Sequence, residues 1–301
     1  MAEQVELLVP ADLDGARVDK ALATLLDVSR ATASLMVESG VDVDGAAVRA
    51  SDKVRSGQII VCQRPDEATA LIPEPIEFTV LHEDDDVIVV DKPAGVVVHP
   101  GSGRTGGTLA AGLLHRYPEL AGVGTEDRWG LVHRLDKDTS GTLLVARTQE
   151  AFATLVEDLR QRRIERTYLT LVEGRMAAST GTIDAPIARD PTQPTRRAVA
   201  HGGKPARTHY QGLDYLEDAD ATLLEVRLET GRTHQIRAHF AAIGHPVAGD
   251  LLYGATRKDL DAPRTFLHAS RLDLIHPTTG EPLTVEAPLP ADLVKVLEAL
   301  A

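Results

Sequence analysis

An aperiodic segment rich in proline separates a short front part of the chain from a much longer body. Between Cys62 and Ile76 the chain carries three prolines, two acidic residues before the middle of the segment, and no helical or strand periodicity. This composition is typical of a linker, because proline interrupts both helices and sheets. We therefore expect two domains, residues 1–70 and residues 71–301, in a chain long enough to bury a sizeable core.

The front part contains the signals of two short helices followed by strands. Helical patterns cover Val18–Leu26 and Ser29–Ser39, and Gly40 ends the second of them. Strand-like runs follow at Val41–Val43 and Gln58–Cys62. The pattern predicts a compact helix-helix-strand unit.

The body alternates strand-like and helical runs, which predicts a mixed α/β architecture of the α+β kind. Val87–Val90 and Thr142–Ala146 are short apolar runs, and Thr222–Glu229 alternates between apolar and charged residues. We expect Thr233 to cap a helix that runs to about Ile243.

Composition is that of an ordinary globular protein, with 43% hydrophobic and 26% charged residues. The single cysteine, Cys62, cannot form an internal disulfide, and the first residues lack the basic and then apolar pattern of a secretion signal. No stretch approaches the ~18 uninterrupted apolar residues of a membrane span. We expect a folded protein of the cytoplasm that does not enter a membrane.

The charge is strongly negative overall and unevenly distributed. The formal net charge is −13, which by itself argues against a nucleic-acid partner. Residues 1–90 carry 7 basic and 18 acidic side chains, whereas residues 159–240 carry 13 and 10. The basic residues of the second range cluster at Arg160, Arg162, Arg163 and Arg166, and at Arg196, Arg197, Lys204 and Arg207. This cluster is either a solvated helix face and loop or a positive surface that binds nucleic acid.

Four segments of the body carry a family resemblance. His133–Gly141, with the sequence HRLDKDTSG, resembles the signature loop of the RluA-type pseudouridine synthases. The other segments match in the same order and together span about residues 80–290: Asp91–Gly95 with His99–Gly101, Arg166–Tyr168, and Gly231–His239 followed by Gly244–Gly254. The resemblance implies a central, mainly antiparallel sheet flanked by helices.

The front part is similar to the small RNA-binding domain named after ribosomal protein S-four. The similarity rests on Arg17–Lys20, on Ser29–Ala31 and on the Gly-Gln-Ile-Ile strand, and a helix-turn-helix unit could produce the same pattern. It implies that Arg17 and Arg30 contact RNA. The two domains together resemble the RluD-like branch, whose members modify large-subunit ribosomal RNA.

The resemblance implies an isomerase that converts uridine to pseudouridine without a metal or another cofactor. Asp136 matches the catalytic aspartate, and a carboxylate beside the glycosidic bond can act as a nucleophile or a base. Tyr168 matches a pocket tyrosine that can stack on uracil and handle the proton on carbon 5, and Arg237 matches the residue that keeps Asp136 ionised and oriented. Without the resemblance, Asp136 would be interpreted as a turn cap and Tyr168 as a half-buried strand residue.

The resemblance also implies that Arg134 enters the base stack in place of the target nucleotide. Arg134 lies two residues before Asp136, so on an extended segment both side chains can project into one cleft. A structural salt bridge is the alternative for Arg134. Arg162, Arg163 and Arg166 are the further residues that we expect to contact RNA.

Asp138 is expected to have a structural role, whereas Asp250 and Tyr253 are expected to shape the wall of the pocket.

Three other functions stay open at this point. The chain could be an inactive RNA-binding or ribosome-assembly factor, or a synthase that acts on transfer RNA. A metal-dependent hydrolase would use His133, Asp136, His234 and His239, but His234 and His239 are five residues apart and do not align on one helix face. We expect a monomer without a metal site, whose partner is large-subunit ribosomal RNA or an assembling ribosomal particle.

Overall fold

A computed structural model describes residues 4–26, 28, 30–63, 71–99, 106–125, 128–193 and 195–300. The described residues form two compact units, a front unit up to Ile72 and a main unit from Pro73 onward. The boundary predicted at residue 70 lies outside the described residues, and the likeness of the front unit to the S-four domain stays a prediction.

The front unit combines a small antiparallel sheet with two helices. In the sheet the strands follow the order β1-β4-β2-β3. Val18, Leu22 and Ile60 lie in its core with no exposed surface. The first predicted helix is confirmed over its full length, and the second begins at Arg30. The elements are β1 (Gln4–Leu8), α1 (Val18–Leu26), α2 (Arg30–Gly40), β2 (Val41–Val43), β3 (Ala46–Ala47) and β4 (Ile59–Gln63), with a 3-10 turn at Ala11–Leu13.

The main unit is built on one large sheet, whose nine described strands run in the order β5-β6-β7-β14-β8-β13-β12-β9, with β15 beside β14. Among the described strands only the β7–β14 pair is parallel. The strands are β5 (Thr79–Glu83), β6 (Val87–Lys92), β7 (Ser140–Ala146), β8 (Glu165–Glu173), β9 (Thr180–Asp184), β12 (Arg207–Leu216), β13 (Ala221–Leu228), β14 (Leu267–Ile275) and β15 (Pro282–Glu286), and a separate hairpin consists of β10 (Ile187–Arg189) and β11 (Arg197–Val199).

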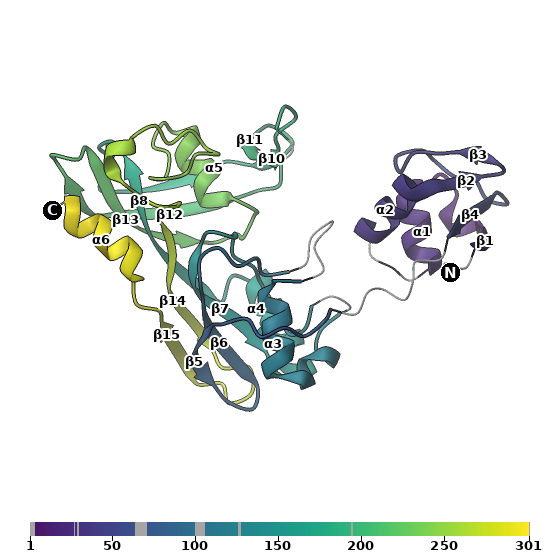
Figure 1. The fold of residues 1–301 in the computed structure, drawn as a ribbon, viewed down its shortest axis with the longest axis horizontal. Helices are drawn as coiled ribbons and strands as arrows, with labels where there is room; N and C mark the ends of the chain where they lie inside the picture. The colour runs from purple at the N-terminus through teal and green to yellow at the C-terminus, as the bar shows by residue number, and fades with distance from the viewer. Residues whose placement is uncertain are drawn as a thin grey trace. The chain divides into compact units, whose positions relative to one another are not determined.

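Helices cover parts of this sheet, as Figure 1 shows. α4 packs against β7, and α5 packs against β11 and β12. Thr108 and Thr148 cap α3 and α4, because each side chain accepts a hydrogen bond from a backbone amide of the first turn. No helix in the described ranges is long and apolar enough to span a membrane. The helices are α3 (Leu109–Arg116), α4 (Gln149–Arg160), α5 (Gln235–Ala242) and α6 (Ala291–Leu300), with 3-10 turns at Pro118–Gly122 and Lys258–Leu260.

This architecture confirms the predicted α+β class with a mainly antiparallel central sheet.

The HRLDKDTSG segment leads directly into the centre of the sheet. All seven residues of β7 are buried, and the strand begins inside the segment at Ser140. Gly141 has a φ of +112°, and a Cβ atom at this position would lie 2.1 Å from the carbonyl oxygen of Ala269 on β14. Only glycine allows this close parallel approach. The end of the segment is therefore anchored by backbone contact between β7 and β14.

Replacing this glycine should destabilise the main unit selectively. Gly141→Ala combines a strained φ with a backbone clash, so we expect the free energy of unfolding to fall by about 3 kcal/mol or more. Gly280→Ala is the control, because Gly280 also has a positive φ but no atom within 4 Å of the added Cβ, and it should cost about 1 kcal/mol. The only tryptophan, Trp129, lies in the main unit, so its fluorescence during urea unfolding reports this unit. Equal losses for the two variants would contradict the packing argument.

Candidate active site

A cavity of about 580 Å³ opens where four segments of the main unit meet. Its walls come mainly from the loop that precedes β7, from the second half of α4 and the residues just after it, from the start of β8, and from the turn that joins β13 to α5. Asp136, Tyr168 and Arg237, the three residues expected to be catalytic, all line it. The structure thus brings together three residues of which the two most distant in sequence, Asp136 and Arg237, are 101 positions apart.

Arg237 holds two carboxylates at once. Its Nη1 donates to Oδ2 of Asp136 at 3.0 Å. Its Nε and Nη2 donate to the two oxygens of Asp250 at 2.5 and 2.9 Å, which is a bidentate pair. Asp250 is 1% exposed, whereas the Asp136 side chain keeps 16% of its surface. Asp250 therefore fixes the guanidinium, and the guanidinium orients the carboxylate that a substrate can reach.

The surroundings of Arg237 stabilise its protonated, charged form. Burial acts to lower the pKa of the Arg237 guanidinium, but its hydrogen bonds to Asp250 and the negative charges of Asp136 and Asp250 raise it above the ordinary value. The ring of Tyr253 lies 5.0 Å from the guanidinium carbon. Asp250 and Tyr253 were expected in the wall of the pocket, yet both lie behind Arg237 and do not line the cavity. Their role is to support Arg237.

Tyr168 forms a buried wall of the cavity. It lies on β8, where it pairs with Val226 of β13 and with Ala269 of β14, and it is 5% exposed. Burial raises the pKa of the phenol; the positive charge of Arg166 lowers it, while the Asp136 carboxylate adds to the increase. The phenol is therefore protonated at neutral pH and close enough to Asp136 to sense its charge.

The start of α5 differs from the prediction. Thr233 does not cap the helix; the N-cap residue is His234, in the left-handed conformation with a φ of +56° and without a capping hydrogen bond from its side chain. Gln235 closes the preceding turn instead, because its Oε1 accepts hydrogen bonds from the Thr230 hydroxyl and the Arg232 amide. The prediction was wrong because it relied on the capping preference of a single residue type. Here the side chain of Gln235, inside the helix, stabilises the turn before α5.

This backbone geometry brings His234 to the site, a position that the sequence suggested only within the metal-site alternative. Its Nε2 lies 4.0 Å from Oδ1 of Asp136, and its Nδ1 lies 3.0 Å from the Tyr253 hydroxyl. Burial lowers the pKa of His234, and the Asp136 carboxylate opposes this shift. His234 is thus a second neighbour of Asp136.

Lys92 supports the loop that carries Asp136 and was also missed. Its side chain has no exposed surface, and Nζ donates to the carbonyl oxygens of Pro93, Val96 and Lys137 at 2.7, 2.8 and 3.0 Å. Burial lowers the pKa of Lys92 to about 7, while the Asp138 carboxylate counters this decrease. Three donors on three carbonyls fix the backbone next to Asp136.

The arginines expected to bind RNA occupy different environments. Arg134 and Arg162 are exposed and line the cavity. Arg166 also lines the cavity but is buried. Arg163 pairs with Asp158 instead and does not line the cavity. In the front unit, Arg17 pairs with Asp19 at 3.0 Å, and the side chain of Arg30 lies outside the described residues.

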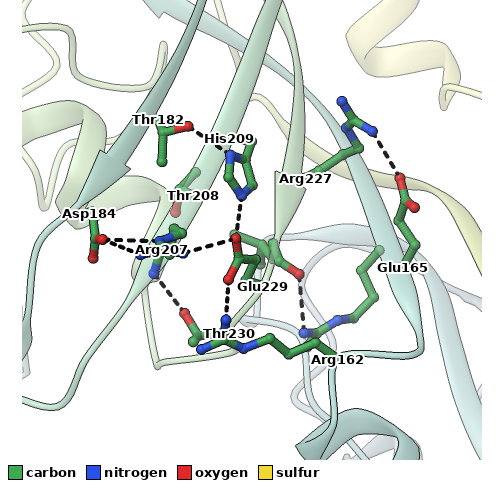
Figure 2. Close-up of polar contacts among 12 residues, drawn as sticks. Arg162, Glu165, Thr182, Asp184, Arg207, Thr208, His209, Arg227, Glu229 and Thr230 are labelled. Atoms are coloured by element: carbon green, nitrogen blue, oxygen red, sulfur yellow. Dashed lines mark hydrogen bonds and ion pairs between the residues drawn. The ribbon is translucent and has the colours of Figure 1, made fainter.

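One carboxylate at the rim of the cavity, Glu229, accepts hydrogen bonds from two arginines and a histidine (Figure 2). It accepts a hydrogen bond from Arg162, another from His209 Nε2 at 2.7 Å, and a longer one from Arg207 at 3.5 Å. The hydrogen bond from His209 and the charges of the two arginines lower the pKa of Glu229. Arg207 also pairs with Asp184 at 2.6 Å. Much of the basic cluster seen in the sequence is therefore paired with acids.

The cavity nevertheless has a strong excess of positive charge. Of the described residues that line it, seven are arginines and two, Asp136 and Glu229, are carboxylates. Such a cavity suits an anionic substrate, even though the net charge of the chain is −13.

The residues proposed for a metal-dependent hydrolase do not form a ligand set. The described residues contain no group of three or more histidine, cysteine or acidic side chains arranged to hold a metal ion. Both ring nitrogens of His239 are hydrogen-bonded, to Thr208 and to the carbonyl of Ala185 at 2.9 Å each. His133 accepts a hydrogen bond from the amide of Leu144. These histidines stabilise the fold.

Comparison with known proteins agrees with this geometry. Residues 86–242 match the family described as RNA pseudouridylate synthase. The chain is 47% identical to ribosomal large subunit pseudouridine synthase D of Nitrosomonas europaea, over 98% of this chain and 88% of that protein. It is 49% identical to an uncharacterized RNA pseudouridine synthase of Chloroflexus aurantiacus, over 99% and 94%. The chain belongs to the RNA pseudouridylate synthase family.

A solved structure supports the same assignment. Human RNA pseudouridylate synthase domain containing 1 superposes with a TM-score of 0.58 and 30% identity, covering 75% of this chain and 96% of that one. The enzyme is thus an isomerase that acts on RNA, and the predicted family is confirmed.

Removing the negative charge of Asp250 should slow the reaction, because Asp250 positions Arg237. Asp250→Asn keeps the shape but removes the charge of the bidentate pair, so we expect the rate constant at saturating RNA to fall by roughly 10- to 100-fold as Arg237 and Asp136 lose their alignment. Asp273→Asn, which breaks an exposed pair with Arg271, is the matched control. Trp129 fluorescence verifies that both variants are folded. A wild-type rate in Asp250→Asn would show that Asp250 does not position the site.

Removing the negative charge of Glu229 should strengthen RNA binding. In Glu229→Gln the guanidinium groups of Arg162 and Arg207 lose this carboxylate and become available to phosphates, so we expect Kd to fall by roughly 3- to 10-fold and the salt dependence of binding to become steeper by about one phosphate contact. The control is Glu165→Gln, because Glu165 pairs with Arg227 and does not line the cavity (Figure 2). Filter binding over a salt series measures both quantities. An unchanged Kd and slope would mean that these cations do not meet RNA.

Proposed function

We propose that this enzyme isomerises specific uridines to pseudouridine in large-subunit ribosomal RNA, with Asp136 as the nucleophile. The observation that carries the proposal is the Asp136 carboxylate, which is held by Arg237 and faces a cavity lined by arginines. Curated relatives named ribosomal large subunit pseudouridine synthase D, 43 to 47% identical to this chain, support the choice of ribosomal RNA.

The proposed chemistry assigns one task to each residue. Asp136 attacks at the sugar as the bond from C1′ to N1 breaks, so the base is released without water or a cofactor. Arg237 keeps the carboxylate pointed at the sugar through its two-sided hydrogen bonding. Tyr168 lies against the base, and its protonated phenol acts as a relay that gives up its own proton as it takes the proton from carbon 5 after the new C–C bond forms.

The rim cations take part in placing the RNA. A uridine within folded RNA has to leave its stack before its C1′ can reach Asp136, at a cost of a few kcal/mol. Arg134 is exposed, lines the cavity and lies two residues from Asp136, so we assign it to the space left by the extruded nucleotide. Arg162 contacts phosphates at the rim.

The front unit is assigned a separate role in RNA binding. The Arg17 side chain is 50% exposed although it pairs with Asp19, so its outer surface can still face a phosphate. Arg30 opens α2 in the same unit. In this proposal the front unit adds affinity for the RNA, whereas the main unit carries the chemistry.

Incubation with unmodified large-subunit ribosomal RNA tests the function directly. Carbodiimide treatment and primer extension should give stops at discrete uridines with the wild type. Asp136→Asn should lower product formation by about a thousandfold or more, because no other carboxylate can replace the nucleophile. Its RNA affinity should stay within about threefold, since affinity comes from phosphate contacts spread over the surface. Asp138→Asn, two residues further along the same loop, is the control and should retain activity.

Other outcomes separate the remaining functions. Stops on transfer RNA in place of ribosomal RNA would assign the enzyme to that substrate. Tight RNA binding with no stops on either RNA would favour a binding or ribosome-assembly factor. Full activity of Asp136→Asn would remove Asp136 from the mechanism, and a large drop in its thermal stability would indicate a structural role.

A further inference from the structure

Arg166 is a buried cation for which the fold provides no counter-charge. It lies on β8, is 7% exposed and lines the cavity. Its Nε has no hydrogen-bond partner, and its Nη2 is 3.5 Å from the carbonyl oxygen of Leu228, which is a weak contact. Among the residues that the structure describes, no carboxylate pairs with it.

This arrangement is costly for the free protein. A guanidinium loses its hydration on burial, and an unpaired buried charge destabilises a fold by several kcal/mol. Burial lowers the pKa of Arg166, and only the nearby Tyr168 phenol counters the shift. The other arginines of the cavity avoid this cost in one of two ways. Three of them pair with carboxylates, namely Arg160, Arg162 and Arg237. The other three are exposed to solvent, namely Arg128, Arg134 and Arg232. Arg166 is thus the one charged group of the cavity that is both buried and unpaired among the described residues.

The depth of Arg166 indicates which part of the substrate it meets. Arg166 and Tyr168 are two residues apart on β8, so their side chains leave the sheet on the same face. Both are buried, whereas Arg134 and Arg162 are exposed. RNA phosphates stay with the backbone at the exposed rim, so the group that reaches the level of Tyr168 is the extruded base.

We infer that Arg166 binds the uracil of the target uridine and stabilises the negative charge that the base carries while it is detached from the sugar. The inference rests on the proposed function. As the bond from C1′ to N1 breaks, its electron pair goes to the base, and the charge spreads over N1, O2 and O4. The base then turns, C5 bonds to C1′ as the Asp136 carboxylate leaves C1′, and the proton leaves C5 while N1 gains one, so the reaction remains an isomerisation and the enzyme is regenerated.

A fixed cation suits this step better than it suits binding of the intact nucleotide. Uridine is neutral in its base, so the interaction with Arg166 becomes stronger as the base detaches. An interaction that is stronger in the transition state than with the bound uridine lowers the activation barrier for breaking the bond from C1′ to N1. Its effect is largest where water is excluded. The buried position of Arg166, which is costly in the free enzyme, is thus useful in the reaction.

Gly231 leaves the space that the guanidinium needs. A Cβ atom at Gly231 would lie 2.8 Å from Nη1 of Arg166, closer than side-chain contacts allow. Gly231→Ala therefore displaces the guanidinium without removing its charge, and it provides a second, independent change at the same group.

Single-turnover rates at saturating RNA, together with Kd, test the inference on the RNA that the wild type modifies. We expect Arg166→Met to lower the rate constant by roughly 100- to 1000-fold and to change Kd by less than about threefold. Arg166→Lys should recover part of the rate, because it restores the charge. Gly231→Ala should be slow by itself and should add little to Arg166→Met, as expected for two changes that act on one group. Arg227→Met, on the neighbouring strand and with an exposed guanidinium, should match the wild type (Figure 2).

Three outcomes would overturn the inference. An unchanged rate constant in Arg166→Met, with a weaker Kd and a salt dependence reduced by about one contact, would make Arg166 a phosphate ligand. Equal losses for Met and Lys, with a lower unfolding midpoint by Trp129 fluorescence, would make it structural. Additive effects of Gly231→Ala and Arg166→Met would separate the two positions. Failure of the proposed function would instead appear as absence of product from the wild type.

Discussion

The arrangement of the site depends on one guanidinium placed between two carboxylates. Arg237 joins Asp136, which the loop before β7 provides, to Asp250, which follows α5 by eight residues. The cation offsets the repulsion between the two carboxylates in this partly enclosed place, and the carboxylates offset the cost of burying the cation. Because the three charges stabilise one another, the loop before β7 and the segment after α5 are held in one geometry. The same cation that stabilises the fold thus orients the carboxylate exposed to the cavity.

The sheet supplies the rigidity that this triad needs. The loop enters β7 through Gly141, whose backbone lies against Ala269 in the one parallel pairing found among the described strands. Between Asp136 and Gly141, the side chain of Lys92 adds a second restraint by donating to the carbonyl of Lys137. The loop is therefore fixed at two points directly after Asp136, and little conformational entropy remains to be lost there when RNA binds.

Local patterns in the sequence predicted the elements well, whereas partners distant in sequence were harder to foresee. The helix at Val18–Leu26 and the alternation that became β13 follow from residues close together. By contrast, Thr233 was expected to cap α5, but Gln235 closes that turn from inside the helix. The pairing of the basic cluster could not be predicted either. Arg162 pairs with Glu229, which lies 67 residues further along the chain, and nothing near Arg162 in the sequence indicates this contact. The family motif located Asp136 and Arg237, but the supporting contacts of Lys92 and His234 are visible only in three dimensions.

The negative net charge and the positive cavity are consistent because the charges fall into two classes. At the rim, Arg162 and Arg207 share the acid Glu229, and these partly exposed charges are screened by salt over about 10 Å at 0.1 M. In the interior, Arg237 is neutralised by its carboxylates and Arg166 is not paired at all in the described structure. Salt therefore weakens attraction of RNA to the rim far more than it weakens the field at the base. An acidic enzyme can thus release RNA readily and still keep a strong positive charge where the reaction needs it.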